Sequence, residues 1–202
     1  MCVFLRPPKA VIAGMLVLFM MVGMVPSAAR ADVVRDVEDW FNKISTMKAN
    51  FIQVASDGTV ASGEIHLRRP HQMKIIYDLD EPLILLTTRI WLHVDRPEER
   101  TLTSYPISET PLSLLLKKQV QLRSDEFTTS SSAENGIISV VLSKDTGEAA
   151  GELTLEFTER PFELRKWTIR DAADISTTVT LQNMRFGHTY ENSFFATANY
   201  TN

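Results

Sequence analysis

A change in the spacing of apolar residues constrains the fold of this chain more than any other sequence feature. From about Lys48 onward, short runs alternate apolar and polar side chains, with polar breaks between them. In one run Leu153, Leu155 and Phe157 fall on one side and polar residues on the other. This alternation is typical of an antiparallel sheet with one face in water. About eleven strands are predicted, near residues 49–56, 60–69, 72–79, 83–88, 90–95, 99–105, 125–131, 137–143, 152–158, 164–171 and 175–182.

A helical spacing precedes the strands. Apolar residues recur at three- and four-residue intervals from Val33 to Met47, which predicts an amphipathic helix lying on an apolar surface. A second, short helix is predicted over 111–118, where Thr110 can cap and Pro111 suits the first turn. We therefore predict a mainly β fold with some α: a single curved antiparallel sheet forming an incomplete, half-open β-barrel covered by lid helices.

Residues 1–31 are interpreted as a cleaved secretory signal peptide. Arg6 and Lys9 precede sixteen uncharged residues, and Ala-Arg-Ala at 29–31 forms an A-x-A cleavage site. A membrane anchor is the alternative, but sixteen helical residues reach only about 24 Å across a hydrocarbon core of about 30 Å. Cys2 lies ahead of the apolar run, so it is not placed to receive a lipid at a cleavage site. We expect a soluble, unanchored chain that starts at Asp32.

Residues 32–202 are predicted to form a single domain. Loss of Arg6, Lys9 and Arg30 leaves 18 of the 21 basic residues against 25 acidic ones, a formal charge of about −7. This balance argues against a nucleic-acid partner, which would require clustered Lys and Arg. Because the mature chain has no cysteine, no disulfide can stabilise it.

The sequence carries no recognisable catalytic or metal-binding motif. It lacks G-x-S-x-G, H-E-x-x-H, a glycine-rich phosphate loop and C-x-x-C. The four histidines have no ligand spacing. The acidic residues around Asp78 and Glu98 have no aromatic platform nearby, as a sugar cleft would need. We therefore predict no enzyme activity, no cofactor and no metal.

The large apolar side chains of a secreted, cysteine-free sheet favour a binding role. Ile65, Leu67 and Arg69 share one side if their strand continues, which sets an arginine at the edge of an apolar surface. A buried guanidinium needs partners, such as backbone carbonyls or a carboxylate on a covering helix. Alternatively the strand ends at Arg68 and Arg69 points to water, and parity alone leaves both interpretations open.

Several segments, taken in order, resemble the LolA family, the periplasmic carriers of outer-membrane lipoproteins. After the opening helix they are MKANFIQ (47–53), GEIHLRRPHQMKIIY (63–77), IWLHVD (90–95), ETPLSLLL (109–116), and the later runs LRKWTIRD and TTVTLQNM. The likeness covers almost the whole mature chain.

The resemblance implies roles for particular residues. In that family helices form a lid over a hydrophobic cavity, and the arginine of an R-P pair holds the lid closed. The resemblance therefore assigns the lid latch to Arg69 and the start of a lid helix to Thr110-Pro111. Trp91 corresponds to the tryptophan before the acidic turn, while Met73 and Ile75 replace aromatic residues common after the R-P pair.

We expect seven strand residues to line the lipid cavity and five residues to belong to the lid, although ordinary core packing would produce the same pattern. The expected walls are Phe51, Ile65, Leu67, Met73, Ile75, Tyr77 and Trp91, and the expected lid residues are Trp40, Ile44, Leu112, Leu115 and Leu116.

The resemblance implies a periplasmic monomer that carries acylated lipoproteins from the inner to the outer membrane. Loading would depend on an inner-membrane ABC transporter, because the sequence has no nucleotide site, and delivery on an outer-membrane lipoprotein receptor where one exists. Two alternatives stay open: a related half-barrel that binds another lipid or senses lipoproteins, and a secreted hydrolase with an unrecognised site.

Overall fold

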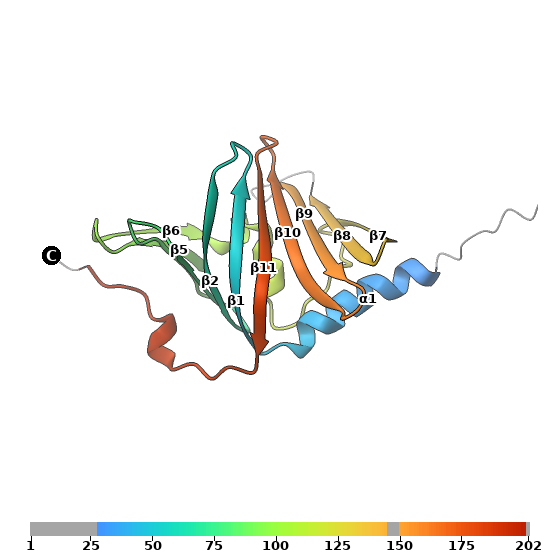
Figure 1. The fold of residues 1–202 in the computed structure, drawn as a ribbon, viewed down its shortest axis with the longest axis horizontal. Helices are drawn as coiled ribbons and strands as arrows, with labels where there is room; N and C mark the ends of the chain where they lie inside the picture. The colour runs from blue at the N-terminus through green and yellow to red at the C-terminus, as the bar shows by residue number, and fades with distance from the viewer. Residues whose placement is uncertain (1–27, 145–149, 201–202) are drawn as a thin grey trace, which may run out of the picture.

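One open, curved antiparallel sheet of eleven strands dominates the computed structural model, which describes residues 28–144 and 150–200 (Figure 1). The strands are β1 (Thr46–Ala55), β2 (Val60–Arg68), β3 (Gln72–Tyr77), β4 (Ile84–Thr87), β5 (Trp91–Arg96), β6 (Thr101–Pro106), β7 (Thr128–Glu134), β8 (Ile137–Lys144), β9 (Gly151–Thr158), β10 (Glu163–Asp171) and β11 (Ser176–Phe186). Their spatial order, β6-β5-β4-β3-β2-β1-β11-β10-β9-β8-β7, leaves β6 and β7 as the two edges. The predicted half-open barrel is confirmed.

The strand register separates a buried concave face from an outer face. Ile65 of β2 lies opposite Ala49 of β1 and Ile75 of β3, and Trp167 of β10 lies opposite Leu155 of β9. All five side chains are buried. Since side chains alternate along each strand, the polar residues between them lie on the outer face. The hydrophobic core therefore lies between the concave face and the elements that cover it.

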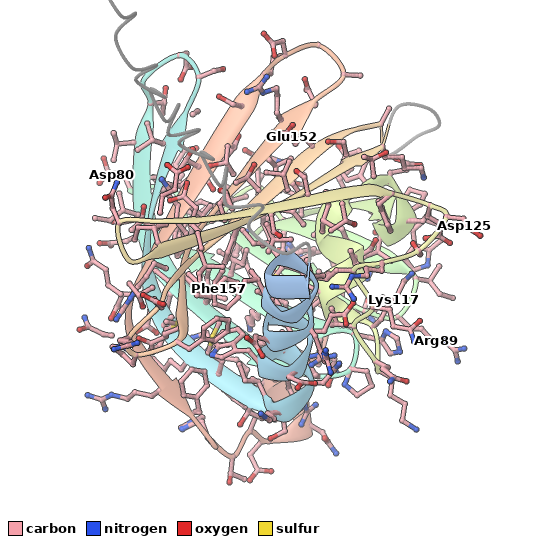
Figure 2. The ribbon with its side chains drawn as sticks, turned by 90° about the vertical axis from the view of Figure 1, so that its right-hand side faces the viewer. Asp80, Arg89, Lys117, Asp125, Glu152 and Phe157 are labelled. Atoms are coloured by element: carbon pink, nitrogen blue, oxygen red, sulfur yellow. The ribbon has the colours of Figure 1, made fainter. Side chains whose placement is uncertain are left out.

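The helix α1 (Ala28–Lys43) covers one part of the concave face. Figure 2 shows it enclosed by the curved sheet, with Phe157 of β9 beside it. The rings of Trp40 and Phe41 meet the Phe157 ring edge to face, with centroids 5.2 and 6.0 Å apart. Val37 is fully buried on the same side of the helix. The predicted amphipathic helix is thus present and turns its apolar side to the sheet.

The boundary between helix and sheet lies earlier than predicted. We expected the helix to include Met47, but α1 ends at Lys43 and β1 begins at Thr46. The Ile44 N–H donates to the Phe41 carbonyl at 3.2 Å and closes the last turn. Met47 fits both the helical spacing and the strand alternation. It lies opposite Leu67, buried on the concave face.

The second predicted helix consists of two short 3-10 turns, η1 (Ile107–Glu109) and η2 (Pro111–Leu116). Thr110 was expected to cap η2, but its hydroxyl instead donates to the Ile107 carbonyl at 3.0 Å. Leu114, Leu115 and Leu116 are buried, as their apolar run predicts. We call α1 together with residues 111–122 the cover.

The C-terminal segment lies over the outer face of the sheet, away from α1 (Figure 1). It contains the short turn η3 (Asn192–Phe195), and we call residues 188–195 the strap. Arg68 donates to the Tyr190 carbonyl at 3.2 Å, and its guanidinium lies 4.7 Å from the centre of the Phe195 ring. The strap therefore covers the part of the outer face around β2 and β3.

The expected signal peptide falls almost wholly outside the described residues. Within the described part, none of the helices combines the length and the apolar character needed to cross a membrane.

Candidate functional site: a closed apolar cavity

A small apolar cavity lies between the cover and the concave face. Its volume is about 40 Å³, and all ten residues that line it are apolar. One water needs about 10–15 Å³ of such volume, so the cavity has room for only a few water-sized groups. The lining residues are Trp40, Phe41, Met47, Ile65, Leu67, Met73, Leu115, Leu116, Leu164 and Trp167. This closed site is too small for an acyl chain unless the cover moves.

Six of the twelve expected wall and lid residues line this cavity: Trp40, Ile65, Leu67, Met73, Leu115 and Leu116. Four other lining residues were not expected. Phe41 and Met47 belonged to the apolar side of the predicted helix, and Trp167 alternates with polar residues in a predicted strand. The sequence pattern could therefore have identified these three residues as inward-facing. Leu164 is separated from Trp167 by a register shift in β10, which strand alternation alone does not reveal.

Three expected wall residues share the concave face but lie farther along the strands. Ile75 is buried, and the rings of Phe51 and Tyr77 meet edge to face with centroids 5.2 Å apart. Among the expected lid residues, Ile44 is half-buried at the junction of α1 and β1. The side chain of Leu112 lies outside the described part of the structure.

Trp91 lies on the other face of the sheet, contrary to the expectation that it lines the cavity. Thr87 pairs with Leu92, which places Leu92 in the concave row that contains Met73. Trp91 therefore points to the outer face, where 43% of its surface is exposed. The motif correctly located the strand, but the pairing register decides which of two neighbouring apolar residues points inward.

Arg69 connects the sheet to both parts of the cover. Strand β2 ends at Arg68, yet the Arg69 side chain turns toward the cover. Its guanidinium donates to the Phe41 carbonyl and, at 2.6 Å, to the Lys117 carbonyl. A longer contact of 3.5 Å reaches the side-chain oxygen of Asn42. One planar group thus contacts the end of α1 and the residues after η2.

The electrostatics of Arg69 fit this position. The Phe41 carbonyl belongs to the last turn of α1, where the helix dipole is negative, and its oxygen also accepts from the Ile44 N–H. Burial lowers the pKa of the Arg69 guanidinium from its usual value, while its Nε is buried without a hydrogen-bond partner. The contacts of the terminal nitrogens therefore compensate only part of the cost of desolvating the charge.

Two further side chains bind α1 to the rest of the cover. Asn42 accepts from the Val120 N–H at 2.8 Å and donates to the Val120 carbonyl at 3.0 Å. Glu38 accepts from the Leu122 N–H at 2.6 Å. Val120 and Leu122 are themselves buried over the core. The cover is thus held as one body by polar contacts, while its inner side is apolar.

The described residues contain no group of three or more His, Cys, Asp or Glu side chains that could hold a metal ion.

Comparison with known proteins gives the following matches. The family model LolA, described as outer membrane lipoprotein carrier protein LolA, matches residues 42–198. The outer-membrane lipoprotein carrier protein of Methylobacillus flagellatus is 25% identical over 185 residues, which cover 85% of this chain and 87% of that protein. An uncharacterized conserved protein from Thermus thermophilus has a similar fold, with a TM-score of 0.52 and 7% identity over 83% of this chain and 93% of its own. A DUF1329 family protein from Desulfovibrio piger has a TM-score of 0.52 and 11% identity, over 85% of this chain and 97% of its own.

Proposed function

The chain belongs to the LolA family, and from this premise we propose that it is a periplasmic carrier that encloses the acyl chains of lipoproteins and moves them from the inner to the outer membrane. The apolar cavity beneath a cover held by polar contacts is the observation that carries the proposal. The name of the Methylobacillus relative supports the same class of cargo. Neither this family nor the sequence motifs favour an enzyme.

The cargo explains why a carrier needs such an interior. Each buried CH₂ group is worth about 0.8 kcal/mol, so one long acyl chain exposed to water costs on the order of ten kcal/mol. Acylated lipoproteins therefore cannot cross an aqueous compartment uncovered. The ten apolar cavity residues provide the kind of surface that such chains would contact.

In this proposal the cover acts as a lid and Arg69 as its latch. The closed cavity of about 40 Å³ cannot hold an acyl chain, so loading requires the cover to separate from the sheet. The Arg69 contacts to Phe41 and Lys117 stabilise only the closed state, because both carbonyls belong to the cover. Cargo stabilises the open state, so the latch lowers the affinity for cargo and favours its release.

The partners follow from the same proposal. Acylated lipoproteins are the cargo, and an inner-membrane ABC transporter supplies the energy for loading, since the sequence has no nucleotide-binding motif. An outer-membrane lipoprotein receptor accepts the cargo where one exists. The carrier works as a monomer, so that one cavity serves one cargo molecule.

Substitution of the latch tests the proposal. Arg69→Leu removes the contacts to Phe41 and Lys117 and should leave the fold intact, since the guanidinium lies at the edge of the core. We expect the variant to bind acylated lipoprotein and to retain it in a release assay with acceptor membranes. The matched control is Arg170→Leu, because Arg170 is exposed and forms its ion pair with Asp174 in the loop after β10. Efficient hand-over by Arg69→Leu would overturn the latch.

Mass spectrometry of the protein purified from its native envelope tests the cargo class. A lipoprotein carrier should carry acylated peptide. Bound phospholipid without acylated peptide would instead identify a glycerolipid carrier, and the absence of any lipid would contradict the proposal.

A further inference from the structure

We propose, building on the carrier function proposed above, that Gln53 and Tyr77 form a polar collar that binds the ester or amide carbonyl groups at the head of the acyl chains. These two residues lie on the concave face, outside the cavity lining. The collar would fix how deeply a chain enters and would distinguish acylated cargo from plain hydrocarbon.

The concave face changes from apolar to polar along its central strands. On β1 the inward residues are Met47, Ala49 and Phe51, followed by Gln53. On β3 the inward series runs from buried Met73 to half-buried Tyr77. The cavity lies at the apolar end of these series, where Met47 and Met73 line it. Gln53 and Tyr77 therefore lie at the end of the concave face that is farther from the cavity.

Gly63 brings the two polar residues together across the intervening strand. It lies on β2, opposite Phe51 on one side and Tyr77 on the other. A Cβ at this position would come within 2.8 Å of the Phe51 ring and 2.1 Å of the Ile76 carbonyl oxygen. With no side chain between them, the Phe51 and Tyr77 rings meet, and the Tyr77 hydroxyl reaches Gln53 at 2.9 Å.

The hydrogen bond between the pair leaves a donor for a ligand. The Tyr77 hydroxyl donates to the Gln53 side-chain oxygen. Among the described residues, no group pairs with the Gln53 side-chain NH₂, and this nitrogen is not among the fully buried polar atoms that lack a partner. An amide NH₂ can donate to a carbonyl oxygen but gains nothing from a CH₂ group. Burial raises the pKa of the Tyr77 hydroxyl, so it stays protonated and keeps the Gln53 oxygen engaged.

The distance from cavity to collar suits one acyl chain. Met73 and Tyr77 are four residues apart on β3, about 13 Å at about 3.3 Å per residue. One leaflet of a bilayer holds acyl chains in about half of its 30 Å hydrocarbon core, or about 15 Å. A chain with its tip at the cavity and its head at the collar would therefore place its first carbonyl near Gln53.

A pair of matched ligands tests the collar. The first is a synthetic triacylated cysteinyl peptide, and the second is its analogue with ether links and an N-alkyl group, so that no acyl carbonyl remains. Affinities are measured by titration calorimetry for the wild type, Gln53→Leu and Tyr77→Phe. Gln182→Leu is the matched control, because Gln182 is exposed on the outer face of β11.

We expect Gln53→Leu to lose about fivefold in affinity for the triacylated peptide and to bind the ether analogue as the wild type does, since one lost hydrogen bond is worth about 1 kcal/mol. Tyr77 is a positioning residue, so Tyr77→Phe should lose about threefold, again for the triacylated peptide alone. Equal losses for both ligands, or no loss for either, would overturn the collar. A wild-type protein that binds neither ligand would overturn the carrier function itself, which is a distinguishable result.

Discussion

Two adjacent arginines have opposite structural roles at the end of β2. Arg68 turns to the outer face, where it contacts the strap through Tyr190 and Asn192. Arg69 turns to the inner side and contacts the cover. Because neighbouring strand residues point to opposite faces, a pair of arginines can hold elements on both sides of one sheet. Substitution of Arg68 should therefore affect the contact with the strap alone, and substitution of Arg69 the contact with the cover alone.

We predict that His66 makes the stability of the protein depend on pH. Its ring is buried between the outer face and the strap, where Nδ1 lies 3.2 Å from the Tyr190 hydroxyl and Nε2 lies 3.3 Å from the Glu64 carboxylate. Lys48 and Lys74 are the nearby cations. Burial lowers the pKa of His66 below its usual value, and the opposing effect of Glu64 is smaller.

The sign of the effect follows from linkage. As pH falls below about 6.5, the unfolded chain takes up a proton at His66 before the folded protein does, so the free energy of unfolding decreases. We predict a lower urea midpoint at pH 5.5 than at pH 7.5, and a smaller difference in His66→Gln. His93, whose pKa burial also lowers, contributes in the same direction in both proteins. An unchanged pH dependence in His66→Gln would contradict the assignment.

At the scale of single residues, the sequence predicted residue type better than orientation. Arg69 and the inward row Ile65, Leu67 and Met73 followed from alternation and motif. Trp91 did not, because one step in register exchanges it with Leu92. The outer burial of His66 was also missed, since it depends on the strap more than 120 residues later.

At the scale of elements, the contacts of Asn42 should decide how firmly α1 is joined to the rest of the cover. Asn42→Ala removes both hydrogen bonds to Val120. We expect the free energy of unfolding to fall by about 1–2 kcal/mol, as measured by urea denaturation. Asn50→Ala is the control, because Asn50 is exposed and its side chain accepts one hydrogen bond, of 3.3 Å, from the exposed Asn183 side chain. Equal stabilities of the two variants would show that the Asn42 contacts contribute nothing.

The strap should contribute to stability through Phe195. This side chain is 4% exposed, against 47% for Phe186 at the end of β11. We predict a loss of about 3 kcal/mol for Phe195→Ala, because it leaves a cavity over the outer face. Phe186→Ala should lose less than about 1 kcal/mol in the same denaturation series. A small effect at Phe195 would indicate that the strap is only loosely attached.

The strands could be predicted from sequence more reliably than the covering elements. The alternation of apolar and polar residues identifies a strand whichever strand it pairs with in the sheet. This explains the agreement over eleven strands. The 111–118 segment was expected to be α-helical, but η2 is a 3-10 turn. Its leucines are placed by the core they cover, and local propensity does not determine the type of turn.

At the scale of the whole molecule, the proposed opening of the cover would exchange one set of apolar contacts for another. Exposing four cover side chains, Trp40, Phe41, Leu115 and Leu116, would cost roughly 6–12 kcal/mol at about 1.5–3 kcal/mol each. That is similar to the cost of leaving one acyl chain in water. Under the proposed carrier function, the empty protein would therefore stay closed, and the loaded protein could stay open with little net change in exposed apolar surface. The LolA resemblance is confirmed, while movement of the cover stays a prediction.

Hydrogen exchange at the amide of His71 tests that movement most directly. In the closed protein this N–H group, in the turn between β2 and β3, donates to the Leu116 carbonyl of the cover at 2.8 Å. We predict that a saturating triacylated peptide accelerates exchange at this amide, while the same peptide without acyl chains has no effect. Stoichiometric binding of the triacylated peptide with unchanged or slower exchange at His71 would contradict the account.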